Sequence, residues 1–148
     1  MGHVKDSIHI DTTVEKIDEF TQYPDGWTSF MAGMGQPEKI VGNGGAGTQI
    51  DFDLPLAGFS LHETVRVTED RLDRDGGHGR YEFEGASSGW EVWKLEPEEG
   101  GTRFAVEQEY VMRGGVLGRV LDRLLFERTT KRDIHRCLEN LKRFLEGP

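Results

Sequence analysis

The sequence has little that would place it in an oxidising compartment, in a membrane or on nucleic acid. Cys137 is the only cysteine in 148 residues, so no internal disulfide can form and a cytoplasmic location is expected. No run approaches the ~18 apolar residues of a membrane-spanning helix, and residues 1–10 lack a signal-peptide core, so we expect no stable membrane insertion. Lysine and arginine number 18 against 27 acidic residues, and a net charge of −9 argues against a nucleic-acid partner.

Hydrophobic residues make up only 35% of the chain, but they recur at regular spacings along almost all of it. A chain of this length buries roughly 70% of its unfolded surface on folding, which is enough for one real core. The 20 glycines indicate tight turns rather than disorder. We therefore predict a single domain over residues 1–148.

A first strand is predicted over Val4–Ile10, followed by two short helices. Thr12 and Glu15 fit a capping box, which starts the first helix directly after Thr12. Asp25 is expected to cap the second helix. That second helix carries three large apolar side chains, Trp27, Phe30 and Met31.

Beyond Pro37 the apolar spacing changes to every second residue, which is the period of a half-buried strand. Turn-forming residues separate the alternating segments and predict hairpins, hence an antiparallel sheet. The six expected strands are Glu38–Val41, Gly47–Leu54, Phe59–Glu69, His78–Gly85, Gly89–Glu96 and Thr102–Met112.

From Val116 to Leu145 the spacing returns to that of a helix of roughly 45 Å, long enough to cross a sheet. One stripe of this helix contains Val120, Leu124, Glu127, Lys131, Ile134, Leu138, Leu141 and Leu145. The element order predicts an α+β fold. In it, a curved seven-stranded antiparallel sheet wraps around a long C-terminal helix, with two short helices after the first strand.

Four stretches occur in a distinctive order and spacing: Ile10-Asp11-Thr12, Val67-Thr68-Glu69, LEPEEGGTRFAVEQEY (95–110) and residues 114–146. Together they resemble the START/polyketide-cyclase superfamily, also called SRPBCC, over nearly the whole chain. The resemblance implies the helix-grip fold of the major birch-pollen allergen, with a deep pocket for a hydrophobic ligand between sheet and long helix. Segment 69–80 is longer and more charged than the usual turn of that family, and many relatives carry larger or apolar groups at Glu127 and Thr130.

Polar residues interrupt the apolar sets of both strands and helix. Glu63 shares a strand face with Leu61 and Val65, and Glu127 lies in the middle of the helix stripe. In a dry core each unpaired polar group costs a few kcal/mol, whereas water or a ligand in a cavity removes most of that cost. We therefore predict a cavity on this face. The alternative is that bulges shift the phase, or that Glu127 pairs with Lys131 on the surface.

The strand over Gly89–Glu96 has two possible orientations, because Trp93 and Leu95 form one set and Trp90 and Val92 the other. The resemblance favours Trp93 inward, and the faces of Glu91 and Trp90 are left open. The residues predicted to line the ligand site are Trp27, Phe30, Met31, Phe52, Glu63, Tyr81, Phe83, Trp93, Gln108, Tyr110, Met112, Glu127 and Thr130.

Three functions are compatible with such a cavity. The first is binding of a small hydrophobic molecule, such as a lipid, quinone or polyketide-like compound. The second is a polyketide cyclase/dehydratase-type enzyme in which Glu63, its pKa raised by burial, is the acid or base and Tyr81 or Tyr110 the donor. The third is a regulatory protein-interaction domain that uses an exposed Trp90 and Val92.

No cofactor or metal site is predicted. Residues 42–47 match G-x-G-x-x-G, and residues 85–89 match G-x-S-x-G, but a strand rather than a helix follows each, so both are interpreted as turns. The five histidines are scattered without metal-ligand spacing, and a solvated face is the simplest interpretation of Asp51 and Asp53. The sequence indicates no oligomeric state.

Overall fold

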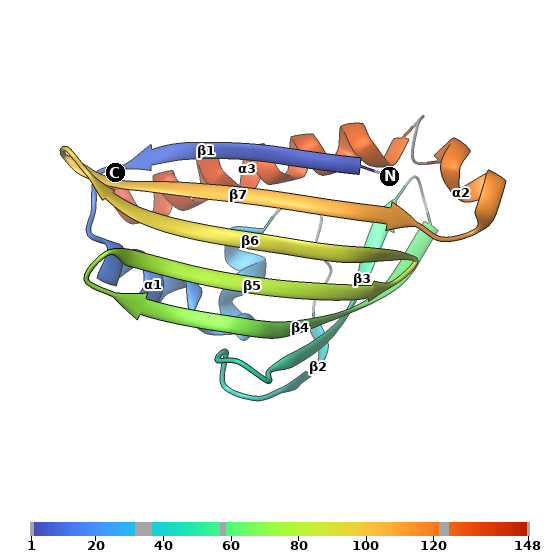
Figure 1. The fold of residues 1–148 in the computed structure, drawn as a ribbon, viewed down its shortest axis with the longest axis horizontal. Helices are drawn as coiled ribbons and strands as arrows, with labels where there is room; N and C mark the ends of the chain where they lie inside the picture. The colour runs from blue at the N-terminus through green and yellow to red at the C-terminus, as the bar shows by residue number, and fades with distance from the viewer. Residues whose placement is uncertain (1, 32–36, 57–58, 122–124, 148) are drawn as a thin grey trace.

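The computed structural model describes residues 2–31, 37–56, 59–121 and 125–147, which form one curved sheet with a long C-terminal helix behind it and a short helix beyond the end of its last strand (Figure 1). The strands are β1 (Gly2–Ile10), β2 (Pro37–Val41), β3 (Gln49–Leu56), β4 (Phe59–Asp73), β5 (Gly76–Gly85), β6 (Ser87–Glu98) and β7 (Gly101–Met112). The helices are α1 (Val14–Thr21), the 3-10 helix η1 (Pro24–Ser29), α2 (Gly115–Leu121) and α3 (Glu127–Glu146). The predicted α+β helix-grip architecture is confirmed.

All neighbouring strands of the sheet are antiparallel, in the order β1-β7-β6-β5-β4-β3-β2. Hairpins join β2 to β7 in sequence, and β1 then pairs with β7, with Gly2 opposite Tyr110 and Ile10 opposite Thr102. The charged segment 69–80 is not a long turn, because β4 continues to Asp73 and β5 begins at Gly76. A register shift between Val67 and Glu69 accommodates the extension.

The first short helix begins one residue later than predicted. Thr13, not Thr12, is its N-cap, and the Thr13 hydroxyl accepts a hydrogen bond from the backbone N–H of Lys16 at 3.3 Å. The carbonyl of Thr12 instead accepts a hydrogen bond from the Thr102 hydroxyl at 2.8 Å, which ties the start of the helix to β7. The predicted capping box of Thr12 and Glu15 is therefore wrong.

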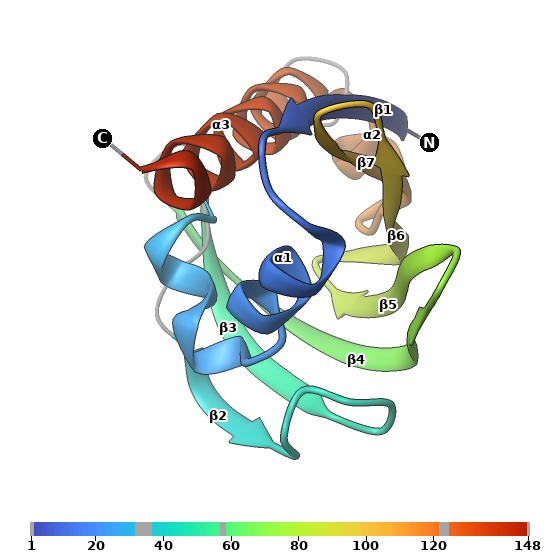
Figure 2. The ribbon, with the colours of Figure 1, turned by 90° about the vertical axis from the view of Figure 1, so that its left-hand side faces the viewer.

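The second short helix is a 3-10 helix that begins at Pro24, so Asp25 lies inside it rather than at its cap. Trp27 and Phe30 are 4% and 1% exposed, and Met31 is partly buried. Figure 2 shows α1 and η1 filling one open end of the curved sheet.

The glycine-rich segment 42–47 is the turn between β2 and β3, as predicted. Gly42, Gly44 and Gly47 have positive φ angles, and a Cβ on Gly44 would lie 2.0 Å from the Gln22 carbonyl oxygen. The glycines therefore let this turn pack against the chain just before η1. A strand follows the turn, so the geometry of a dinucleotide site is not formed there.

The C-terminal region is two helices rather than the single helix predicted over Val116–Leu145. A π-helical turn at Leu125 and Phe126 leads into α3. Glu127 and Lys131 point to solvent with their side chains 46% and 59% exposed, and they pair with each other at 3.3 Å. The predicted stripe is therefore wrong in this half of the helix. Leu124, which was part of that stripe, lies outside the described residues.

The core lies between the concave face of the sheet, α1 and α3. Its least exposed apolar side chains, all at 0 or 1%, are Ile10, Ile17, Phe30, Ile50, Phe104, Tyr110, Leu138 and Leu141. Each large apolar side chain buried in this way contributes about 1.5–3 kcal/mol. Within the described ranges, no helix is both long and apolar enough to cross a bilayer.

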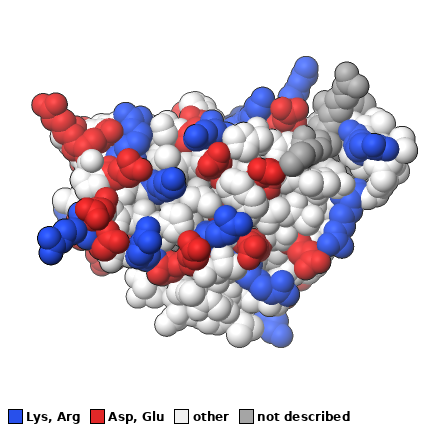
Figure 3. All heavy atoms as spheres, in the orientation of Figure 1, with Lys and Arg blue, Asp and Glu red and all other residues white. Residues whose placement is uncertain are grey.

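The outer face of the sheet carries acidic and basic side chains intermixed (Figure 3). Arg113 pairs with Glu84 at 2.8 Å, and Arg66 approaches the same carboxylate at 3.9 Å. Exposed pairs of this kind contribute little to stability. The outer face is therefore an ordinary solvated surface, and the unusual features of the structure lie on the concave side of the sheet.

Candidate ligand-binding cavity

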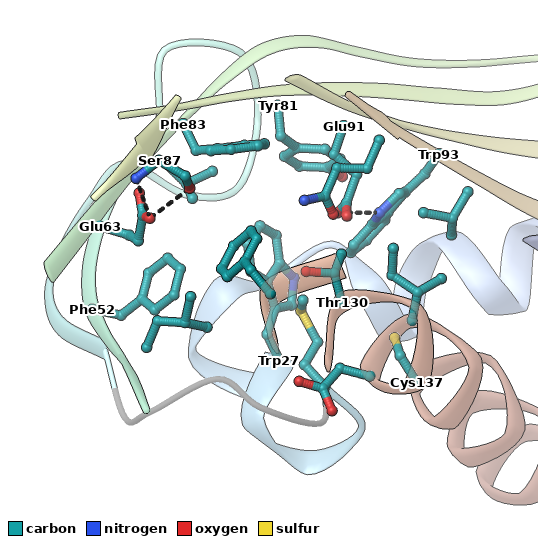
Figure 4. Close-up of a pocket in the computed structure, with 18 residues that line it drawn as sticks. Trp27, Phe52, Glu63, Tyr81, Phe83, Ser87, Glu91, Trp93, Thr130 and Cys137 are labelled. Atoms are coloured by element: carbon teal, nitrogen blue, oxygen red, sulfur yellow. Dashed lines mark hydrogen bonds between the residues drawn. The ribbon is translucent and has the colours of Figure 1, made fainter. Parts of the chain in front are cut away.

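A cavity of about 150 Å³ lies between the concave face of the sheet and α3 (Figure 4). Side chains from β3 to β7, η1, the turn before α3 and α3 itself form its wall. The lining residues are Trp27, Met31, Phe52, Leu54, Glu63, Val65, Tyr81, Phe83, Ser87, Glu91, Trp93, Val106, Gln108, Phe126, Thr130, Asp133, Ile134 and Cys137.

Three aromatic rings in mutual contact form one side of the cavity. Trp27 lies 5.6 Å from both Tyr81 and Trp93, and Tyr81 lies 4.7 Å from Trp93, measured between ring centroids. The indole N–H of Trp27 donates to the carbonyl of Thr21 at 2.8 Å, which fixes its ring and joins the end of α1 to the cavity wall. This side of the cavity is therefore apolar and held in place by the short helices.

Glu63 is a buried carboxylate, 3% exposed, on the cavity face of β4. Its Oε1 accepts hydrogen bonds from the backbone N–H and the hydroxyl of Ser87, at 3.0 and 2.7 Å. Its Oε2 is buried and has no hydrogen-bond partner among the described residues. Burial raises the pKa of Glu63, and the two Ser87 bonds lower it by a smaller amount.

The turn between β5 and β6 brings Ser87 to Glu63. Gly85 lies opposite Glu63, and a Cβ there would be 2.2 Å from the His62 carbonyl oxygen and 2.9 Å from Glu63 Oε2. Only glycine leaves room for the carboxylate at this corner. The G-x-S-x-G segment is thus a turn, as predicted, but its serine also positions Glu63, which the sequence analysis missed.

Glu91 lies on the cavity face of β6, directly opposite Tyr81. Its Oε2 accepts a hydrogen bond from the Trp93 indole N–H at 2.9 Å, and burial raises its pKa to about 7. Trp90 is on the other face, partly buried, with the Arg80 guanidinium 5.2 Å from its ring centroid. The sequence left open which face of the sheet Glu91 and Trp90 occupy. In the structure Glu91 and Trp93 point inward and Trp90 points outward.

The remaining polar lining comes from β7 and α3. Gln108 is on β7, Thr130 and Asp133 are on α3, and Asp133 Oδ1 lies 3.4 Å from Arg132 Nε. Burial raises the pKa of the Cys137 thiol, so this cysteine stays protonated and is not an activated nucleophile.

Nine of the 13 predicted ligand residues line the cavity: Trp27, Met31, Phe52, Glu63, Tyr81, Phe83, Trp93, Gln108 and Thr130. Phe30, Tyr110 and Met112 are buried in the core beside it. The Tyr110 ring lies over Gly2 and 4.8 Å from Phe126, which turns it away from the cavity. Glu127 faces solvent, so its predicted role in the lining is wrong.

Several lining residues were not predicted as site residues. Leu54, Val65 and Val106 belong to the inward apolar sets of their strands. The alternation of apolar and polar residues along each strand could therefore have identified them. Ile134 belongs to the predicted helix stripe, whereas Phe126, Asp133 and Cys137 lie on a face beside that stripe. A helical stripe through Phe126, Thr130, Asp133 and Cys137 would have found these three.

A second group of ligating atoms lies outside the cavity. Glu38, Asp53 and His62, from β2, β3 and β4, bring one ligand atom each to within 4.8 Å of the others. The side chains of His62 and Asp53 are 56% and 44% exposed, with 3.5 Å between Nδ1 and Oδ1. None of these three residues lines the cavity.

Comparison with known proteins places the chain in one family. Residues 1–146 match the family model described as polyketide cyclase/dehydrase and lipid transport. No curated protein matches the sequence.

Three solved structures show the same fold. The protein TTHA0849 of Thermus thermophilus is 18% identical with a TM-score of 0.76, covering 95% of this chain and 94% of that one. The ZhuI aromatase/cyclase of Streptomyces sp. R1128 is 14% identical with a TM-score of 0.74, covering 96% and 94%. Ara h 8.0201 is 14% identical with a TM-score of 0.68, covering 97% of each chain.

Proposed function

The chain belongs to the polyketide cyclase/dehydrase and lipid transport family, and on that premise we propose that it binds a small hydrophobic molecule in the cavity between its sheet and α3. A lipid, a quinone or a polyketide-like compound is the class of ligand. The supporting observation is a cavity walled mainly by aromatic and aliphatic side chains with a few polar groups. Burying the ligand's apolar surface supplies affinity at about 25 cal/mol per Å² before the costs of ordering.

The size of the cavity limits what fits without a change in its wall. A volume of about 150 Å³ is comparable to the engineered cavities that take up benzene. Sites for drug-sized ligands measure about 300–1,000 Å³. The occupant is therefore a ring-sized group, or part of a longer molecule whose remainder displaces side chains or extends outward.

The test is native mass spectrometry of the protein purified from its own host, with two matched variants. Val106→Phe adds a ring to the cavity wall, whereas Val92→Phe adds one to the outer face of β6. We expect a co-purifying hydrophobic molecule in the wild type and in Val92→Phe, and its loss in Val106→Phe. Added toluene should also quench or shift the fluorescence of Trp27 and Trp93 in the wild type and in Val92→Phe, but not in Val106→Phe. Absence of both a bound molecule and a toluene response would overturn the proposal.

A second candidate function is acid–base catalysis of the cyclase/dehydratase kind, and the pKa of Glu91 favours it. A carboxyl group with a pKa of about 7 is suited to exchange a proton near neutral pH. Burial also raises the pKa of Tyr81, which lies opposite Glu91, so its hydroxyl stays protonated and can donate. Turnover of a poly-β-keto mimic that is lost in Glu91→Gln, with the fold intact, would support this function.

The pair of Glu63 with Tyr81 or Tyr110 that the sequence suggested is not favoured by the geometry. The Tyr81 hydroxyl lies over Gly79, six positions along β5 from Gly85, which faces Glu63. That separation is about 20 Å along the strand. Tyr110 is packed away from the cavity. The third function, a protein-interaction surface, would use Trp90, which is partly covered by Arg80.

A further inference from the structure

Where the chain is described, the cavity is lined by acidic side chains without basic ones. Glu63, Glu91 and Asp133 line it, and none of the described lining residues is lysine, arginine or histidine. Carboxylates away from water are costly unless a cation or hydrogen-bond donors compensate them. Arg132 lies 3.4 Å from Asp133, so the acceptors left for an occupant of the cavity to satisfy are those of Glu63 and Glu91.

Glu91 has unused capacity to accept hydrogen bonds. Its Oε2 receives the indole N–H of Trp93, and the described part of the chain provides no other hydrogen bond to this side chain. An ionised carboxylate accepts about four hydrogen bonds through its two oxygens. A donor placed in the cavity beside Glu91 would therefore find an acceptor ready, and a charged donor would form the stronger bond.

Glu63 gives the same indication independently. Both of its hydrogen bonds come from Ser87 and reach Oε1, while Oε2 has no partner within the described residues although the residue is only 3% exposed. Natural proteins rarely leave such an atom unsatisfied without a functional reason. The cavity thus has acceptors in excess of donors at two separate places in its wall.

The aromatic groups beside Glu91 favour a cation over a neutral donor. Tyr81 is opposite Glu91 in the sheet, and Trp93 donates to it, so a ligand group at the carboxylate would lie close to both rings. The faces of Trp and Tyr attract ammonium groups, and the attraction increases where water is excluded. An anionic group at the same position would meet repulsion from the carboxylates.

We propose that this cavity selects hydrophobic ligands by the charge of their polar end, accepting a ring-sized body that carries a protonated amine and excluding carboxylates and phosphates. The amine donates to Glu91 beside Tyr81 and Trp93, and the apolar body extends toward Phe83 and Phe52 (Figure 4). This assignment rests on the proposed function, because it names the chemical class that the same cavity takes.

The charge state of Glu91 makes the selection depend on pH. Tyr81 from β5 and Cys137 from α3 face Glu91, and the charge of Glu91 contributes to raising the pKa of each, so both are neutral near pH 7. Asp133 lines the cavity from α3, and Glu63 from β4. The positive groups that act on Glu63, His62 and Arg113, lie outside the lining. Affinity for an amine should therefore increase between about pH 5.5 and pH 8.5 as Glu91 loses its proton.

The test compares four compounds with one phenylethyl-like body: 2-phenylethylamine, 2-phenylethanol, ethylbenzene and phenylacetate. Each is titrated into the wild-type protein at about pH 8 and moderate salt, with tryptophan fluorescence and calorimetry as readouts. The same titrations use Glu91→Gln, and Glu96→Gln as a control that removes an exposed charge from the outer face of the same strand. Urea unfolding of each variant verifies that it is folded.

We expect the amine to bind most tightly, then the alcohol and the hydrocarbon, with phenylacetate weakest. Glu91→Gln should weaken amine binding at least tenfold and change ethylbenzene binding less than twofold, whereas Glu96→Gln should change neither. Phenylacetate binding as tightly as the amine, or an amine preference that survives in Glu91→Gln, would overturn this inference while the proposed function stands. If none of the four compounds binds, this inference is overturned, and the proposed function is decided by the co-purification and toluene experiments above. The ranking in the wild type decides the matter even if a variant fails to fold.

Discussion

Replacing Glu91 by glutamine is expected to stabilise the unliganded protein at alkaline pH. The pKa of Glu91 is about 7 in the folded protein, against 4.5 for the same group in water. A group whose pKa is raised on folding adds stability below its unfolded pKa, and this contribution is lost as the pH rises through the folded pKa. Above pH 7, therefore, the folded protein carries a charge that the unfolded chain would solvate better.

The magnitude follows from the two pKa values. At about 1.4 kcal/mol for each tenfold change in proton affinity, the interval from 4.5 to about 7 corresponds to about 3 kcal/mol of lost stability at pH 8.5. Glutamine has the same shape, carries no charge and keeps an oxygen that can accept the Trp93 N–H. Glu91→Gln should therefore gain about 2–3 kcal/mol at pH 8.5 and less than about 1 kcal/mol at pH 5.

Urea unfolding of wild type and variant at both pH values measures this difference, because other titrating groups cancel between the two proteins. Glu96→Gln, on the exposed face of the same strand, should change the free energy of unfolding by less than about 0.5 kcal/mol at either pH. A Glu91→Gln variant that is less stable than wild type at pH 8.5, or a gain of the same size at both pH values, would refute the reasoning.

Three other substitutions probe the supports of the cavity and sheet. Ser87→Ala removes the hydroxyl that donates to Glu63 and should cost about 1–3 kcal/mol in urea unfolding at pH 8. The loss should shrink as the pH is lowered, because burial raises the pKa of Glu63 and a protonated carboxyl is the weaker acceptor; a loss that is the same at every pH would contradict this. Thr13→Ala should cost about 1 kcal/mol by thermal unfolding through loss of the helix cap, and a larger loss in Thr12→Ala would show the assignment of the cap to be wrong. Gly89→Ala would place a Cβ 2.0 Å from the backbone oxygen of Glu109 in β7 and force the two strands apart. Amide hydrogen exchange along β6 and β7 should therefore become faster, and unchanged protection would disprove this close contact.

The strand half of the fold could be predicted because strand periodicity is a local property. Leu61, Val65 and Val67 alternate with polar residues, so the anomaly of Glu63 was visible in the sequence, and the structure places its side chain in the cavity wall. The extension of β4 to Asp73 was not visible. Its charged residues are typical of a turn, but hairpin pairing with β5 keeps them extended.

The helix half of the site could be predicted only in part, because the face of α3 that points inward differs between its two ends. Ile134, Leu138 and Leu141 of the predicted stripe are buried, whereas Glu127 and Lys131 on the same stripe face solvent at the end of α3 that follows the π-helical turn at Leu125 and Phe126. The sequence pattern has no glycine or proline at this turn to announce it. The role of Ser87 was hidden for a different reason, since its partner is 24 residues away along the chain.

The pairing of β1 with β7 has a consequence for how the protein is made. During synthesis Gly2–Ile10 has no partner in the sheet until Gly101–Met112 has left the ribosome. Contacts between such distant segments form slowly, because the entropy of closing a long loop is lost before the contact is gained. The hairpins formed by β2 to β6 therefore remain without β7 and β1 until the last strand has been made. We expect the curved sheet to be completed late and in a single step rather than strand by strand.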